Sequence, residues 1–137
     1  MENTHIHSSF DNDLNKLNDN LLKLGNTALE QFDNCINNFG TQNLEEIEKV
    51  VGGDTILDDL DDRVQKLGFE IIALRAPQAA DLRRIIVALK IATIFERIGD
   101  YSRNISNRTK LLIELNYSDL PGVNIGKMGQ KTLTMME

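Results

Sequence analysis

The chain has 137 residues, of which 41% are hydrophobic and 26% are charged, and it carries only 2 prolines. This length is typical of one domain, and the composition is typical of a soluble helical protein, which excludes disordered, collagen-like and linker sequences. The formal net charge of −6 also excludes the basic excess by which nucleic-acid binders neutralise phosphates. No nucleic acid is therefore expected as a partner.

The single cysteine, Cys35, cannot form a disulfide within the chain, and the N-terminal MENTHIHSSF lacks the basic and apolar regions of a signal peptide. No apolar run approaches the roughly 20 residues that span a bilayer. Arg75, Lys90 and Arg97 interrupt the candidates. We expect a cytoplasmic protein that meets membrane proteins only peripherally.

The first expected helix begins at Ser8 or Ser9, which are suitable N-caps, and ends at Gly40, where glycine can adopt the left-handed closing conformation. Its apolar residues recur at alternating steps of three and four, which is typical of an amphipathic helix. They are Phe10, Leu14, Leu17, Leu21, Leu24, Ala28, Cys35 and Phe39.

Two further helical runs follow. One begins near Asn43 and ends before Pro77, with a kink or break expected at Gly52 and Gly53. The other begins at Asp81, a suitable N-cap, and reaches about Leu115. Alternating strand patterns are absent from the sequence, so the predicted fold class is all-α: an antiparallel three-helix bundle over residues 8–115 with neighbouring axes about 20° apart.

The third helix carries two apolar stripes, which indicates apolar neighbours on two sides. One stripe is Leu82, Ile85, Leu89 and Ala92, and the opposite one is Val87, Ile91, Ile94, Ile98 and Ile105. Basic residues lie between the stripes: Arg83, Lys90, Arg97 and Arg108.

Residues 116–126 have the composition of a linker, and the segment after them resembles the first helix. KMGQKTL at 127–133 echoes KLGNTAL at 23–29. If the echo marks a repeat, residues 127–137 are the start of a second helical repeat, and the sequence is truncated within it.

Acidic residues gather on two of the predicted helices. Glu96 and Asp100 continue the stripe that Leu82 begins, and Asp54, Asp58 and Asp61 share one face of the second helix. An antiparallel pairing would bring these five carboxylates together, where a bound cation would relieve their repulsion.

The residue types narrow the choice of metal. Carboxylate oxygens suit Mg²⁺, Ca²⁺, Mn²⁺ or iron in a carboxylate-rich cluster. Both histidines, His5 and His7, lie in the N-terminal segment, which argues against zinc and against the Glu-x-x-His pattern of ferritin-like proteins. An alternative stays open: the acids could pair with Arg97, Arg103 or Lys66 as a solvated face.

Three segments resemble the PhoU family of phosphate-specific transport system accessory proteins. They are KLGN at 23–26, GDTILDDLDDRV at 53–64 and RAPQAADLRRIIVALKIATIFERIGDYSRNI at 75–105. The resemblance implies two tandem three-helix bundles, each with paired E/D-x-x-x-D motifs that bind metal. Here those positions are Asp54 with Asp58 and Glu96 with Asp100, to which the helical pattern adds Asp61.

The resemblance also implies a function. Family members are negative regulators of phosphate-starvation signalling and modulate the phosphate ABC transporter, through contacts with the sensor histidine kinase PhoR and the transporter ATPase PstB. Homodimers and bound metal, whether iron, manganese, magnesium or zinc, are expected on the same ground. With a second repeat missing, an apolar face that the second bundle would cover is expected to be exposed.

Two functions are compatible with these residues. One is a signalling adaptor for phosphate homeostasis with metal on its carboxylate face, and the alternative is a helical bundle that sequesters metal in a carboxylate cluster. No nucleophile–base pair, glycine-rich phosphate loop or Cys-x-x-Cys occurs in the sequence, so we expect no enzyme.

Overall fold

The computed structural model describes residues 2–117 and 124–136; the side chains of residues 2–8 and of Asp54 lie outside that description. The elements are α1 (Glu2–Thr41), α2 (Leu44–Gly52), α3 (Asp54–Arg75), α4 (Ala79–Glu114) and α5 (Ile125–Met136). Within the described ranges there is no strand, which confirms the predicted all-α class.

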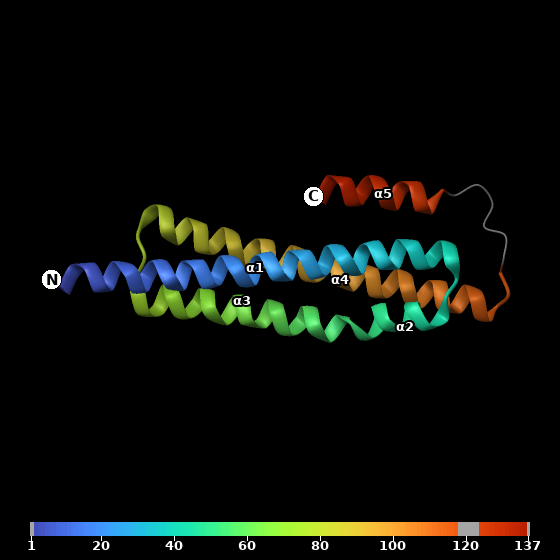
Figure 1. Cartoon of the computed structure of the whole chain (residues 1–137), viewed down its shortest axis with the longest axis horizontal. Coiled ribbons are helices and arrows are strands. Elements are labelled where there is room, and N and C mark those ends of the chain that lie inside the picture. The colour runs from blue at the N-terminus through green and yellow to red at the C-terminus, as the bar shows by residue number, and fades with distance from the viewer. Residues whose placement is uncertain (1, 118–123, 137) are drawn as a thin grey trace.

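Three long rods form the bundle (Figure 1). α1 and α4 run in the same direction. α2 and α3, which lie between them in the sequence, together form one rod that runs in the opposite direction. α1, α3 and α4 pack against one another in all three pairs, and α2 continues the middle rod against α1 and α4. The predicted up-down-up antiparallel bundle is confirmed.

The core follows the predicted apolar stripes of the three rods. Its fully buried members include Leu24 of α1, Leu57 and Val64 of α3, and Ile85 and Ala92 of α4. Complete burial of such a leucine, isoleucine or valine side chain contributes about 1.5–3 kcal/mol relative to exposure. The stripes therefore hold the bundle together.

Predicted helix ends differ from the observed ones in three places. α1 begins at Glu2, ahead of the predicted caps at Ser8 or Ser9, because no helix-breaking residue stands in that segment. At its other end, Gln42, the residue directly after the helix, adopts the left-handed conformation that was predicted for Gly40, with φ of 54°. The Gln42 N–H donates to the Asn38 carbonyl at 2.9 Å and thereby closes the last turn.

The start of α4 is the third difference. Its N-cap is Gln78, whose side chain makes no capping hydrogen bond, whereas Asp81 lies inside the first turn. The Asp81 N–H instead donates to the Gln78 carbonyl at 3.1 Å. An acidic residue there still faces the positive end of the helix dipole, which is favourable.

The predicted break at Gly52 and Gly53 is present, since α2 ends at Gly52 and α3 begins at Asp54. Gly53 is also a close-approach site: a Cβ at this position would lie 2.5 Å from Nε2 of Gln31 on α1. The run predicted to begin near Asn43 does so: Asn43 is the N-cap of α2, because its side chain accepts from the N–H groups of Glu45 and Glu46.

α5 lies in the segment where a new helix was predicted from Lys127, and it begins two residues earlier, at Ile125. It packs against the C-terminal half of α1 in the opposite direction (Figure 1). Gly129 allows this contact, since a Cβ there would lie 2.5 Å from Cγ2 of Ile36. The predicted linker at 116–126 falls largely on residues 118–123, outside the described part of the chain.

No helix in the described part of the chain combines the length and the apolar character that crossing a bilayer requires. This agrees with the charged interruptions seen in the sequence.

Candidate carboxylate site

Four of the five predicted acidic residues, those whose side chains are described, lie where the first turns of α3 pack against the middle of α4. Gly99 of α4 is buried against Leu57 of α3, so closely that an added Cβ would collide with Cδ1 of that leucine. This contact aligns the turn that carries Glu96 and Asp100 with the turn that carries Asp58 and Asp61. The antiparallel pairing therefore places Asp58 and Asp61 of α3 on the flank of the bundle where Glu96 and Asp100 of α4 lie.

The raised pKa of Glu96 indicates that the three other described acids lie near it. The pKa of Glu96 is raised, first by partial burial and then by the carboxylates of Asp100, Asp58 and Asp61, of which Asp100 also shares a hydrogen bond with it. Repulsion of this kind indicates more negative charge than the local protein groups neutralise. A cation placed among these acids would reverse the effect.

One arginine enters the site. Arg103, one turn after Asp100 on the same helix, donates from Nη2 to Oδ1 of Asp100 at 2.6 Å, and both side chains are 37% exposed. The alternative in which Arg103 pairs with the acids is thus realised for Asp100. Neither Arg97 nor Lys66, the other cations considered, forms an ion pair with a described carboxylate.

A polar bridge that the sequence analysis missed fixes the other side of the site. Gln65 Nε2 donates to Oδ1 of Asp61 at 3.1 Å, to the Leu89 carbonyl at 3.3 Å and to Oγ1 of Thr93 at 3.4 Å. The amide therefore spans α3 and α4 and orients the Asp61 carboxylate. The sequence indicates this role only by position: Gln65 follows Asp61 by four residues and therefore lies on the same face of the helix.

The acids differ in exposure and in how far the structure describes them. Asp58 is exposed, whereas Asp61, Glu96 and Asp100 are half-buried. The side chain of Asp54 lies outside the described residues. Among the side chains that are described, no three His, Cys, Asp or Glu groups stand close enough to form a ready metal cage. The prediction of a five-ligand site thus stays a prediction.

The donor set nevertheless fits a hard cation. It offers carboxylate oxygens from two facing helices, and partial burial together with the neighbouring carboxylates raises the pKa of Glu96. Oxygen ligands of this type suit Mg²⁺, Mn²⁺ or Ca²⁺.

Comparison with known proteins identifies a family whose model covers the part of the chain that carries this site. A family model described as the PhoU domain matches residues 21–109. That range covers the C-terminal half of α1, all of α2 and α3, and α4 through Thr109, and so includes every predicted acidic ligand. The chain belongs to the PhoU family.

Several PhoU relatives align along most of the chain. A phosphate-specific transport system accessory protein PhoU homolog from Caulobacter vibrioides is 33% identical over 126 residues, covering 92% of this chain and 55% of the relative. The homolog from Clostridium acetobutylicum is 31% identical over 129 residues, covering 93% and 58%. That from Aquifex aeolicus is 33% identical over 102 residues, covering 74% and 46%. The chain spans about half the length of these relatives.

Proposed function

We propose that this PhoU domain is a regulator of phosphate homeostasis that restrains phosphate-starvation signalling and modulates the phosphate ABC transporter. The observation that carries the proposal is the family match over residues 21–109, together with relatives that are accessory proteins of phosphate-specific transport. The proposed action is by protein contact, without catalysis, in the cytoplasm.

The proposed partners are the sensor histidine kinase PhoR and the transporter ATPase PstB, with a homodimer as the proposed assembly. A bundle suits this work because its long helices present extended, preformed surfaces to partners. The charge excess around Glu96 supports a metal-binding role for the carboxylate flank. There a bound cation would hold α3 and α4 in fixed register.

The test is deletion of the gene, followed by assay of alkaline phosphatase activity in phosphate-rich medium. Loss of a negative regulator is expected to leave the enzyme expressed when phosphate is ample, and a plasmid copy of the chain is expected to restore repression. Activity that is as low in the deletion strain as in the parent would reject the regulatory role.

The same deletion strain distinguishes the regulatory function from the alternative, in which the domain sequesters metal. Complementation with Glu96→Gln/Asp100→Asn is expected to restore repression partly or not at all if metal supports partner contact. If the deletion changes cellular metal content and leaves phosphatase activity unaltered, the sequestering function is favoured instead.

A further inference from the structure

The outer face of α4 carries a regular row of apolar and basic residues. Val87, Ile94 and Tyr101 recur every seven residues and are 53%, 56% and 62% exposed. Arg83, Lys90 and Arg97 alternate with them at steps of three and four, and all three are exposed. These six residues define the α4 outer face.

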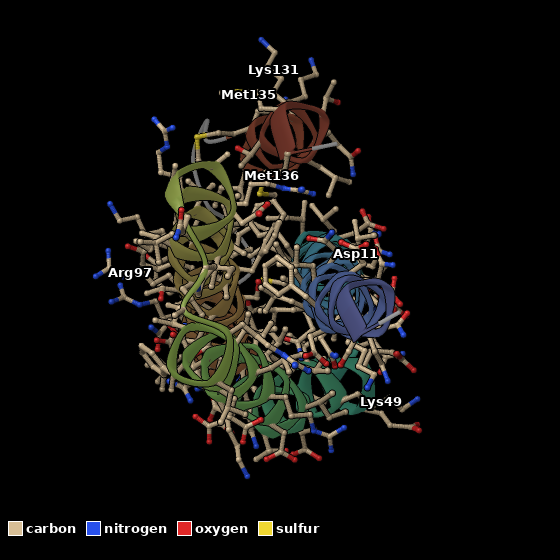
Figure 2. The ribbon with its side chains drawn as sticks, turned by 90° about the vertical axis from the view of Figure 1, so that its left-hand side faces the viewer. Asp11, Lys49, Arg97, Lys131, Met135 and Met136 are labelled. Atoms are coloured by element: carbon tan, nitrogen blue, oxygen red, sulfur yellow. The ribbon has the colours of Figure 1, made fainter. Side chains whose placement is uncertain are left out.

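No described helix covers this face. α1, α2 and α3 pack on other sides of α4, and α5 packs on α1. Figure 2 shows Arg97 projecting away from the bundle, on the side opposite α1. Within the described residues, Val87 and Ile94 therefore have no apolar neighbour on this side of α4. Of the second stripe, Ile91 is half-buried and lines a groove of about 320 Å³ with Phe95 and Met136.

The basic members of the face have no acidic partner among the described side chains. Within the described part of the chain, Arg83, Lys90 and Arg97 form no ion pair, and the Arg83 Nε donates only to the carbonyl of Ala79 at 3.3 Å. Unpaired cations beside exposed apolar side chains are unusual on a chain whose net charge is −6. Such a surface favours an apolar ligand with acidic flanks.

We propose that the α4 outer face is a docking site for an acidic amphipathic helix of a partner protein. Its spacing of three and four matches the seam of two packed helices, and the row from Arg83 to Arg97 and Tyr101 extends about 27 Å at 1.5 Å per residue. Apolar residues of the partner would cover Val87, Ile94 and Tyr101. Its Glu and Asp side chains would pair with the three cations.

Two other occupants fit the surface less well. A symmetric contact between α4 of two copies would place one basic row against the other, which is repulsive. A bilayer with anionic lipids would attract the basic row, but it would also approach a molecule whose overall charge is negative. An acidic amphipathic helix would cover the apolar residues and pair with the basic ones, and it would bring neither basic row against basic row nor the whole acidic molecule against an anionic bilayer.

The inference deepens the proposed adaptor role and relies on it only for the identity of the partner. The decisive experiment measures binding of the chain to the purified cytoplasmic region of the kinase and to the purified ATPase by titration calorimetry. The test variant is Arg83→Glu/Lys90→Glu/Arg97→Glu. The matched control, Lys16→Glu/Lys23→Glu/Lys66→Glu, reverses three exposed cations on other faces, and circular dichroism establishes that both variants are folded.

The expected result is binding of wild type and control to one of the two proteins, with the test variant weakened about tenfold or more. Binding by the wild type should also fall as salt is raised, because the contact is partly ionic. Equal binding by the test variant would overturn the α4 site while leaving the adaptor role intact. A wild-type chain that binds neither protein would remove both.

Two side measurements assign the surface to another occupant if the inference is wrong. Sedimentation of wild type with phosphatidylglycerol vesicles, lost in the test variant, would make the face a membrane site. A dimer in analytical ultracentrifugation that the test variant alone dissociates would make it a self-contact. Either result contradicts docking of a partner helix.

Discussion

Glu96 is a residue of the carboxylate site whose pKa is shifted. Its pKa is raised from the ordinary value of 4.5 by partial burial and by Asp100, Asp58 and Asp61. The folded protein therefore holds this proton more tightly than the unfolded chain, and ionised Glu96 opposes folding. As pH falls through the raised pKa toward the ordinary value, this cost disappears.

Replacing Glu96 with Gln is expected to raise the melting temperature at pH 7.5 in the presence of EDTA, because the substitution removes one of the four mutually repelling charges. The gain should shrink toward pH 4, where wild-type Glu96 is protonated. Glu70→Gln, at an exposed position of α3, serves as the control. A melting temperature that falls in the Glu96 variant at neutral pH would contradict this account of the site.

Gly99 is the second residue on which the site depends, because it lets α3 and α4 approach. In Gly99→Ala the new methyl group would collide with Leu57. We expect a loss of about 1–3 kcal/mol in the free energy of unfolding, measured by urea denaturation. Gly40→Ala is the matched control, since its Cβ meets no atom within 4 Å. It should leave stability unchanged or raise it by up to about 1 kcal/mol.

At the scale of elements, periodicity predicted the bundle because apolar stripes at helical spacing have to face a common core. The same reasoning paired α3 with α4 and so brought together the acids of both helices. It placed helix ends less well, because a cap depends on backbone conformation: Gln42, rather than Gly40, adopts positive φ, and Gln78 stands where Asp81 was expected.

The parts of the site that sequence could not supply are contacts between helices. Gln65 bridges Asp61 and the α4 backbone, a role that appears only when the register of the two helices is known. The pairing of Asp100 with Arg103 was one of several open alternatives, because spacing alone does not select among neighbouring cations. The sequence likewise could not show which residues of the second stripe on α4 are exposed, because that depends on where the neighbouring helices pack.

The docking of α5 on α1 can be tested at Gly129. Gly129→Leu is expected to separate the two helices, because any Cβ at this position already meets Ile36. Amide hydrogen exchange within α5 should therefore become faster. Gly126→Leu introduces the same side chain at an exposed position with no atom within 4 Å of its Cβ, and should leave exchange nearly unchanged. Equal exchange in both variants would show that α5 is not held by this contact.

At the scale of the whole molecule, charge is unevenly distributed between neighbouring segments. Acidic residues gather in the segment 43–62 and basic ones in 82–110, and Lys110 Nζ joins Glu48 Oε1 at 2.9 Å across α4 and α2. An exposed pair of this kind contributes about 0.2–1 kcal/mol, so charge orients the rods weakly and the apolar core holds them. The acidic residues of the carboxylate site and the basic residues of the α4 outer face are the charges on which the two proposed binding sites depend.

The central claim is that the acids of α3 and α4 hold a cation, and equilibrium dialysis against Mn²⁺ tests it most directly. The wild type and the control Glu30→Gln/Glu70→Gln, which neutralises two exposed acids elsewhere, are expected to retain the ion. Glu96→Gln/Asp100→Asn is expected to lose it. Equal retention by all three proteins, or none by the wild type, would contradict the account.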